Sequence, residues 1–456
     1  MDRVKCETPN ASNITCGTHS EAVRCASDTT LETEGADYPP TIKEGVQSCP
    51  GSDIAMLTIF PFRRLLIGCA LLLLPCAMAY PCAAQPQRSL CNKGNNEFQA
   101  IFRTGVGVTV ESAKSEGLSV RQCQASLQWK TENIVVAENA AQIDLDLFGV
   151  DLVKNGPVAA FQIKKSAAEC CASYQIYSLE KPPRLLRTIT GGSIYTASDR
   201  DLDGRVEIWT DDSAAMNGLD GIQLAYMEYP PACVLRFENG KLLDASGEFQ
   251  DYFDGIAGRI REAMNPDALQ EFKRSDGRLQ ADISSDFDRI VRMRRVKIQI
   301  LEIVLAYLYS GREQEAWRGL SEMWPAGDVE RIRREIVNAR SKGILSQVDG
   351  VSEMNPRARQ LAGAIYKQTE VTPARAIYLW RPEPSNSADY TALETEVVLD
   401  LVIDSAGKVS SAAPWGKEGT ADDGLLSAAR EWKFIPGLKN GHSVASQLRI
   451  YTSLRR

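Results

Sequence analysis

Short runs in which apolar and polar residues alternate fill the region between residues 92 and 245 of this 456-residue chain. The runs lie at residues 106–110, 142–147, 159–163, 173–177 and 206–209. Turn-forming residues separate them at short intervals, and alternation broken by close turns is typical of antiparallel sheet. The pattern therefore predicts a β-rich N-terminal module over residues 92–245.

The spacing of the apolar residues changes after Pro230 and Pro231. Apolar residues then recur every three or four positions, which is the period of a helix with one buried face. The expected helices lie at residues 249–264, 266–272, 284–309, 313–323 and 328–340. This spacing predicts an α-helical region over residues 246–345. The junction of the third and fourth helices is similar to a tetratricopeptide helix pair. A single hairpin is not a repeat array, so a local helical hairpin packed on the β-rich module is favoured over a peptide-binding groove.

A third pattern follows several prolines between residues 373 and 384, which indicate a linker or boundary. It comprises a strand, a turn, a return strand, a helix and a last strand, at residues 396–403, 404–407, 408–410, 421–432 and 444–451. Asn440-Gly441 is a strong tight-turn dipeptide just before the last strand. The pattern predicts a small α+β domain over residues 372–456, and the whole chain is expected to be an α+β multidomain protein.

Composition and charge exclude several classes of function. The chain has 52 Lys plus Arg against 59 Asp plus Glu, a formal net charge of -7, and two histidines, His19 and His442. A net negative charge argues against electrostatic binding of nucleic acid, because such binding needs a surplus of basic residues on one face. The small number of histidines disfavours a histidine-based catalytic triad or a two-histidine metal motif. We expect a protein that binds no nucleic acid and is not an enzyme.

Residues 56–84 have the order of a secretory signal peptide starting near Met56. A basic pair, Arg63 and Arg64, precedes an apolar run, and small residues suited to cleavage follow. The run of about 15 residues is short of the ~20 that cross a bilayer, although a retained anchor or a lipid on Cys69 are alternatives. We expect a periplasmic or cell-envelope protein that associates with a membrane only through this segment if it stays uncleaved.

Residues 1–55 precede the expected signal peptide and show no periodic apolar pattern. They are interpreted either as disordered or as a start called too early, with Met56 as the true first residue. The cysteines that follow the signal peptide are Cys91, Cys123, Cys170, Cys171 and Cys233. In an oxidising compartment this odd number leaves at least one unpaired. Because Cys170 and Cys171 are adjacent, we expect each to pair with one of the other three.

The strongest chemical motif lies in the β-rich module between residues 199 and 207. Asp199, Asp201 and Asp203 alternate, Gly204 permits a sharp turn, and Glu207 stands at the ninth place, while Arg205 can offer its backbone carbonyl. Such spacing can gather hard oxygen ligands around Ca²⁺. These five residues, Asp199, Asp201, Asp203, Arg205 and Glu207, are therefore the candidate metal ligands, and Ca²⁺ is the candidate ion.

Two other interpretations of this motif stand beside a calcium site. Position twelve is Thr210 rather than Glu and no flanking helices are expected, which disfavours an EF-hand. The motif resembles the DxDxDG loops between strands of FG-GAP or VCBS-like β-propeller repeats, although only one copy is present. An acidic hairpin turn that holds no metal is the simpler interpretation.

The end of the chain, roughly residues 390–456 and under a fifth of its length, resembles the C-terminal domain of TonB-type energy transducers. The resemblance is carried by the string VVLDLVIDSAGKVSSA, by the block from Ala428 to Pro436 with Trp432 and Phe434, and by Asn440-Gly441. It implies a small α+β domain that contacts an extended segment of an outer-membrane transporter by strand addition at its last strand. The partner-binding residues expected on that strand are Val444, Ser446, Leu448, Ile450 and Thr452.

Two functions follow from these patterns. The first is a non-enzymatic cell-envelope protein whose TonB-like domain binds a partner protein, an outer-membrane transporter or another envelope protein, in energy-coupled transport across the outer membrane. The second is a secreted protein whose β-rich module binds Ca²⁺ or a glycan, with the C-terminal domain only docking it. The same C-terminal residues can also be core and turn positions of a small fold used for other contacts.

Overall fold

The computed structural model describes residues 91–92, 98–114, 121–152, 156–166, 170–279, 286–353, 363–379, 394–415 and 423–455. The segment 1–55 and the expected signal peptide at 56–84 lie outside the described residues. Within these ranges no helix is both long enough and apolar enough to cross a bilayer. All of the described residues belong to one compact unit.

Antiparallel strands form the first part of the described chain, as the alternation predicts. They are β1 (Cys91–Asn92), β2 (Phe98–Ile101), β3 (Gly107–Lys114), β4 (Arg121–Trp129), β5 (Glu132–Ala140), β6 (Gln142–Asp151), β7 (Pro157–Lys164), β8 (Ser173–Ser178), β9 (Arg184–Thr190), β10 (Tyr195–Ser198), β11 (Glu207–Asp211), β12 (Ala232–Glu238) and β13 (Lys241–Asp244). Their sheets have the orders β1-β6-β7-β8-β9, β2-β3-β4-β5 and β10-β11-β12-β13-β14, in which β14 (Gly350–Val351) is the parallel partner of β13.

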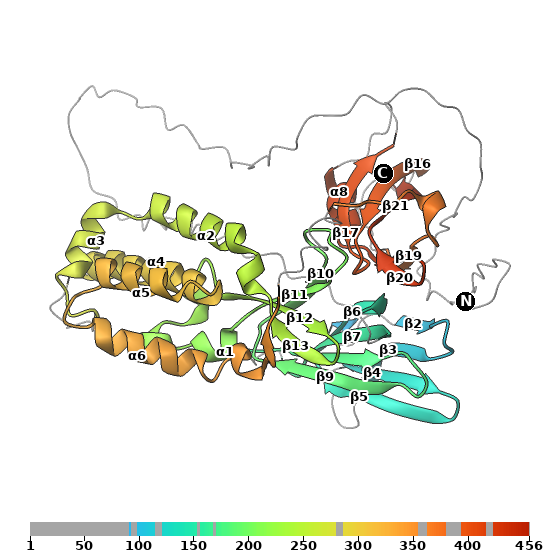
Figure 1. Cartoon of the computed structure of the whole chain (residues 1–456), viewed down its shortest axis with the longest axis horizontal. Coiled ribbons are helices and arrows are strands. Elements are labelled where there is room, and N and C mark those ends of the chain that lie inside the picture. The colour runs from blue at the N-terminus through green and yellow to red at the C-terminus, as the bar shows by residue number, and fades with distance from the viewer. Residues whose placement is uncertain are drawn as a thin grey trace, which may run out of the picture. The chain divides into compact units, whose positions relative to one another are not determined.

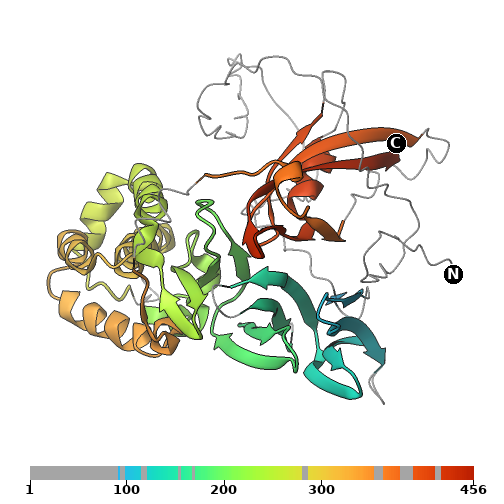
Figure 2. The same ribbon diagram turned by 45° about the vertical axis from the view of Figure 1, so that its right-hand side comes forward.

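Five longer helices follow the strands and are gathered as one group (Figures 1 and 2). They are α2 (Gln250–Ala263), α3 (Pro266–Lys273), α4 (Phe287–Tyr309), α5 (Glu313–Met323) and α6 (Val329–Arg340). The short helices are α1 (Ser213–Met216), η1 (Leu219–Gly221), η2 (Leu224–Tyr226), η3 (Ser246–Glu248), η4 (Ile344–Gln347) and η5 (Gln368–Glu370). The prediction of helices over residues 246–345 is confirmed at the level of these elements.

Local chemistry sets the ends of these helices. The Asn265 side chain accepts a hydrogen bond from the Ala268 N–H at 3.0 Å, and Pro266 occupies the first turn of α3, where a missing N–H costs nothing. Gly311 follows α4 with a φ of 80°, a left-handed conformation that ends a helix easily. The apolar face of α4 and the strand β12 share one hydrophobic core, so the helices pack directly on the sheet.

The C-terminal segment, residues 363–455, forms a smaller α+β arrangement. Its elements are β15 (Arg375–Tyr378), β16 (Glu394–Ile403), β17 (Val409–Pro414), α8 (Asp423–Arg430), β18 (Lys433–Ile435), β19 (Gly437–Lys439), β20 (His442–Val444) and β21 (Ser446–Arg455). The main sheet has the order β17-β16-β21, and β15 pairs with β18. Leu425 and Ala429 of α8 join the core beneath this sheet together with Trp432 and Phe434. The mixed α+β content of the chain is therefore confirmed.

Two turns of the C-terminal segment contain left-handed residues, at places where the sequence predicts turns. Gly407 has a φ of 81°, and a Cβ at this position would lie 2.0 Å from the Phe434 carbonyl oxygen. Asn440 and Gly441 have φ values of 53° and 87°, which join β19 to β20 in a tight hairpin. Only glycine fits the first turn, so β16 and β17 reverse direction at a defined residue.

Strand β6 is buried on both faces, which is unusual for a strand that carries two carboxylates. Ile143 and Leu145 face one hydrophobic core, and a bulge after Leu145 shifts the alternation further along the strand. Asp144 and Asp146 are only 2% and 3% exposed. Two buried carboxylates on one strand are costly unless cations or hydrogen bonds compensate them.

The C-terminal segment supplies those cations. Lys433 forms an ion pair with Asp144 and donates a hydrogen bond to the Leu145 carbonyl oxygen at 3.1 Å. Lys408 forms an ion pair with Asp146 and donates to its carbonyl oxygen at 2.7 Å. Burial alone would raise the pKa of Asp146, but the two lysines hold it below the usual range of a carboxyl. The C-terminal segment is thus docked on β6 through buried charge pairs.

The disulfide pattern differs from the expected one. Cys91 is bonded to Cys123, but Cys170 and Cys171 are bonded to each other, so the expectation that each pairs elsewhere is wrong. Cys91 and Cys123 already engage each other, and Cys233 is buried in β12 as the one free cysteine among the described residues. Among the described residues, Cys233 alone remains outside the two disulfides, and a single cysteine cannot serve both members of the adjacent pair.

Replacing Lys433 with Met tests the docking of the C-terminal segment. The substitution keeps an extended apolar side chain but removes the ammonium group beside the buried Asp144 carboxylate. We expect the free energy of unfolding, measured by urea denaturation, to fall by about 3–5 kcal/mol. Lys241→Met, at an exposed position of β13, is the control and should change it by less than about 0.5 kcal/mol.

The double variant Lys433→Met/Asp144→Leu should recover most of this stability, because it removes both charges from the same buried place. A Lys433→Met protein as stable as the control would contradict the buried ion pair.

Candidate functional site

The acidic loop, residues 199–207, joins β10 to β11 and is shaped by its own carboxylates. Asp199 accepts hydrogen bonds from the Asp203 N–H at 2.9 Å and from the Gly204 N–H at 3.0 Å. Leu202 and Gly204 have φ values of 56° and 84°, so the loop turns sharply at these two residues. This closure brings the beginning and the end of the loop together, as the alternating acids predict.

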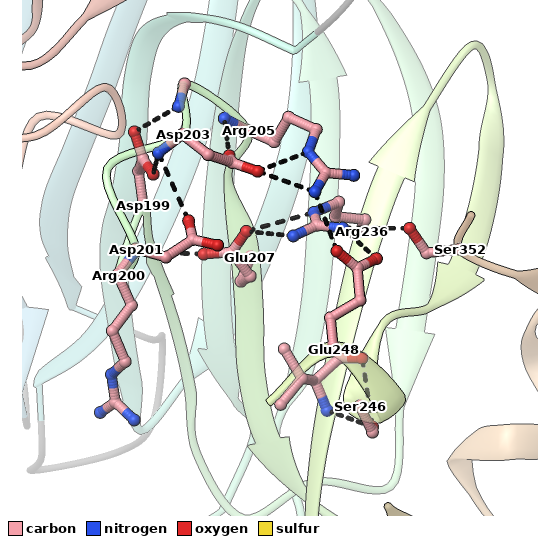
Figure 3. A network of polar contacts seen from close by, with 12 residues as sticks. Asp199, Arg200, Asp201, Asp203, Arg205, Glu207, Arg236, Ser246, Glu248 and Ser352 are labelled. Atoms are coloured by element: carbon pink, nitrogen blue, oxygen red, sulfur yellow. Dashed lines mark hydrogen bonds and ion pairs between the residues drawn. The ribbon is translucent and has the colours of Figure 1, made fainter. Parts of the chain in front are cut away.

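Three of the five predicted ligands converge. One carboxylate oxygen from each of Asp199, Asp201 and Glu207 lies within 4.8 Å of the others. Asp199 and Glu207 are buried, whereas Asp201 is exposed and forms the open side of the group. Figure 3 shows the three carboxylates together, with the Arg200 side chain directed away from them.

The side chains of the other two predicted residues, Asp203 and Arg205, pair with each other. The Arg205 guanidinium donates from Nε to Asp203 Oδ2 at 2.7 Å and from Nη2 to Glu248 Oε2 at 2.8 Å. Asp203 is therefore occupied by a side-chain cation and does not belong to the three-carboxylate group.

Arg236 is a central residue of the site that the motif did not indicate. Its Nη2 donates to Glu207 Oε1 at 2.7 Å, and its Nη1 lies 2.5 Å from Glu248 Oε1 and 3.0 Å from Ser352 Oγ. Figure 3 shows Arg236 between the two glutamates. The guanidinium is completely buried. An arginine inside the apolar run ACVLRFE of β12 was the available signal, because such a residue needs a buried acidic partner.

The negative charges of the three carboxylates are not fully compensated by neighbouring cations and hydrogen bonds. Burial raises the pKa of Asp199 to about 6, although the Ser405 hydroxyl and the Gly204 N–H oppose it. Burial also raises the pKa of Glu207 to about 8, despite the opposing charge of Arg236. The pKa of Asp201 is also raised, because its carboxyl is partly desolvated although the residue is exposed, and because Asp203 lies nearby. An additional positive charge would therefore stabilise the ionised form of the group.

The geometry of the three oxygens suits one divalent cation. Ca²⁺ binds oxygen at about 2.3–2.6 Å, so two of its ligands can be no more than about 5 Å apart. The separation within 4.8 Å meets this limit. Carboxylate oxygens are the ligands that Ca²⁺ prefers, and water can complete its shell from the exposed side at Asp201.

The predicted partner-binding residues lie mostly inside the C-terminal segment. Leu448 and Ile450 belong to its core, and Ser446 and Thr452 are also buried. Val444 is half-buried and lies in β20, opposite Gly437, rather than in β21. A partner at this strand would therefore meet main chain and the intervening side chains, not the side chains at these five positions.

Backbone groups of β21 point outward along its outer edge, the side away from β16. Gln447 N–H donates outward to the Tyr366 carbonyl oxygen at 2.8 Å, and the Ala445 carbonyl oxygen accepts from Tyr366 N–H at 3.0 Å. Since the backbone groups of alternate residues point to the same side of a strand, those of Arg449 and Tyr451 also point outward. In the described part of the chain, β21 has no strand partner on this side.

The two edges of the β17-β16-β21 sheet differ in regularity. β17 is six residues long, ends at Pro414 and pairs with β16 across a bulge. β21 is ten residues long and pairs with β16 without a break from Ser446 to Arg455. Bulges, prolines and short length protect an edge against added strands. β21 is therefore the edge that remains open to one.

No family model, curated protein or solved structure matches this chain.

Replacing Gly204 with Ala tests the conformation of the acidic loop. A Cβ at this position has open space around it, so the cost comes from the positive φ alone. We expect the free energy of unfolding to fall by about 1 kcal/mol in thermal denaturation. Gly258→Ala, in the middle of α2 with equally open surroundings, is the matched control and should raise it by up to about 1 kcal/mol. Equal stabilisation by both substitutions would argue against the left-handed turn.

Proposed function

We propose that this chain is a non-enzymatic, multidomain cell-envelope protein whose C-terminal domain, residues 372–456, is TonB-like and binds a partner by strand addition. The partner is an outer-membrane transporter or another envelope protein, and the process is energy-coupled transport across the outer membrane. The observation that carries the proposal is the open outer edge of β21.

Main-chain groups supply the affinity in this mode of binding. The outward N–H and C=O groups of Arg449 and Tyr451 continue the line that Gln447 begins with Tyr366. An extended segment that pairs along this line adds a fourth strand to the β17-β16-β21 sheet. Each net hydrogen bond contributes about 0.5–1.5 kcal/mol, so a few of them give a modest affinity that side chains can adjust.

Side chains beside the edge provide an exposed surface for such adjustment. Arg449 Nε donates to Asp400 Oδ1 at 2.8 Å, and its guanidinium lies 4.4 Å from the ring centroid of Trp415. Trp415 is 48% exposed. A strand added beside β21 would place alternate side chains next to Arg449, and aromatic and arginine residues are enriched where proteins bind one another.

The cysteines support the location. A disulfide between Cys91 and Cys123 joins two strands of the described chain. Structural disulfides persist in oxidising compartments such as the periplasm and are rare in the cytosol. This chemistry supports export, together with the signal-like segment at residues 56–84.

Replacing Tyr451 with Pro tests strand addition. Proline removes the outward N–H of residue 451, which β16 does not use, so the protein should still fold. We expect the full chain to capture an outer-membrane transporter from a detergent-solubilised outer-membrane fraction, and Tyr451→Pro to bind it about tenfold more weakly or not at all. The bound proteins are identified by mass spectrometry and titrated by surface plasmon resonance.

Tyr451→Ala is the matched control, because it removes the ring but keeps the N–H, and it should bind within a few-fold of the original chain. Equal capture by the Pro and Ala variants would contradict strand addition. Capture of a different class of envelope protein, still sensitive to proline, would retain strand addition and reject the role in outer-membrane transport.

The three-carboxylate group supports a second candidate function, the binding of Ca²⁺ by the acidic loop. Asp199, Asp201 and Glu207 offer converging oxygens, two of them buried. The only side-chain cation that contacts Glu207 within the described residues is Arg236. A divalent ion would offset the remaining negative charge.

Isothermal titration calorimetry with CaCl₂ tests this candidate. We expect Asp201→Ala to weaken Ca²⁺ binding by at least about tenfold, because it removes one of the three carboxylate ligands. Asp254→Ala, which removes an exposed carboxylate of α2 paired with Arg312, is the control and should leave Ca²⁺ binding unchanged. An original chain that releases no Ca²⁺-dependent heat would remove the ion from the function of this loop.

A further inference from the structure

Aromatic rings from β11 and from the start of α2 form one packed group at the surface. The Trp209 ring contacts Phe249 and Tyr252 edge to face, with centroid separations of 5.0 Å and 5.1 Å. Trp209 belongs to β11, Phe249 directly precedes α2, and Tyr252 lies in its first turn. Tyr252 is 37% exposed and Trp209 is half-buried. Sheet and helix thus share an aromatic contact that reaches solvent.

The Arg200 guanidinium lies against this aromatic group. Its Cζ is 4.0 Å from the Trp209 ring centroid and 5.5 Å from that of Tyr252. Figure 3 shows the Arg200 side chain directed away from the carboxylates of the acidic loop. The contact between a cation and an aromatic ring is attractive. The rings therefore hold the charge of Arg200 apart from the acids of its own loop.

Arg259, two turns further along α2 than Tyr252, extends the same surface. Its Cζ is 5.2 Å from the Tyr229 ring centroid, and its Nε donates to the Tyr229 hydroxyl at 3.3 Å. A Cβ on Gly255 would lie 3.5 Å from Arg259 Nη1. Because residues 252, 255 and 259 share one face of a helix, the guanidinium lies back along α2 toward Tyr252. The result is a continuous strip in which rings and guanidiniums alternate.

Within the described part of the chain, neither guanidinium of this strip has an acidic partner. Arg200 forms no ion pair there, and the only side-chain hydrogen bond of Arg259 is the one to Tyr229. Arg205 and Arg236, by contrast, are both paired with carboxylates. A guanidinium over a ring still presents N–H groups along its edge, and that edge matches the two oxygens of a carboxylate.

The rings also order the two arginines before anything binds. A long side chain loses rotamer freedom when an interface fixes it, and this loss weakens binding. The aromatic contacts already restrict Arg200 and Arg259, so less freedom remains to be lost. Trp, Tyr and Arg are also the residue types that contribute most to binding between proteins. The composition of the strip therefore favours a protein partner, and its charge favours an acidic one.

We propose that the strip of Trp209, Tyr252, Tyr229, Arg200 and Arg259 is a docking surface for an extended, acidic segment of a partner protein. The inference goes beyond the proposed functions, because it uses neither the edge of β21 nor the converging carboxylates. An extended chain projects alternate side chains to one face, so acidic residues at alternate positions can meet both guanidiniums. The apolar atoms of such a segment would pack on the rings between them, which a small free anion cannot do.

Fluorescence anisotropy with two labelled peptides tests this surface. The probe is a short fluorescein-labelled peptide in which Glu alternates with Ser, and its neutral counterpart carries Gln in place of Glu. We expect the full chain to bind the Glu peptide at least about tenfold more tightly than the Gln peptide. The double variant Arg200→Gln/Arg259→Gln should bind the Glu peptide at least about tenfold more weakly than the original chain. Added NaCl should weaken the binding.

Arg333→Gln is the matched control, since Arg333 also lies over an aromatic ring, with its Cζ 4.9 Å from the Trp317 centroid, but lies outside the strip. It should bind the Glu peptide within about twofold of the original chain. Arg259→Lys keeps the charge and alters the fold least, so it guards against a double variant that fails to fold. We expect it to bind about threefold or more weakly, because an ammonium group lacks the two-pronged edge of a guanidinium.

Three results would overturn the inference. One is equal binding of the Glu and Gln peptides, or no binding of either. Another is full affinity for the Glu peptide in both the double variant and Arg259→Lys, which would place the binding elsewhere. The third is displacement of the peptide by free glutarate or by an oligogalacturonide at equal or lower concentration, which would make the strip a site for a small anion or an acidic glycan. Tyr451→Pro and Asp201→Ala should leave peptide binding unchanged, so failure here is separate from failure of either proposed function.

Discussion

The pairing of Asp144 and Asp146 with two lysines is the constraint on which the arrangement of the described chain depends. β6 is buried on both faces, so its carboxylates cannot be hydrated in place. Hydrogen bonds from the Tyr174 hydroxyl and the Ala197 N–H compensate Asp146 in part. The opposite charges come from Lys408 and Lys433 of the C-terminal segment. Docking here also brings the β16–β17 turn against the acidic loop. The position of the candidate cation site is thus a consequence of charge balance on a single strand.

Much of the fold was predictable because its signals are local. The strands of the β-rich part, the five long helices and the turn at Asn440-Gly441 follow from period, capping and turn chemistry within short stretches. Contacts between distant residues carry no such signal. Nothing near Cys170 indicates that Cys91 and Cys123 are already bonded, which removes two of its three expected partners. Nothing near Asp199 indicates that Asp404 meets it.

The candidate sites show the same division between local and distant information. Alternating acids predicted the convergence of Asp199, Asp201 and Glu207, but not the competition of Arg205 for Asp203. For the last strand, alternation identifies two faces without saying which one α8 covers. The apolar positions turned out to face the core, so the surface that a partner can reach consists of backbone and of residues such as Arg449.

Tyr366 of the same chain already occupies the first residues of the outer β21 edge. Tyr366 holds two hydrogen bonds there, to Ala445 and Gln447. A foreign strand that pairs only with Arg449 and Tyr451 leaves them intact, whereas a longer one must first break them. Tyr366 is an intramolecular competitor and therefore acts at a high effective concentration. Each residue by which a foreign strand extends toward Ser446 therefore adds less binding free energy than its new hydrogen bonds alone would supply. The edge therefore selects its occupants by length as well as by sequence, and it favours short extended segments.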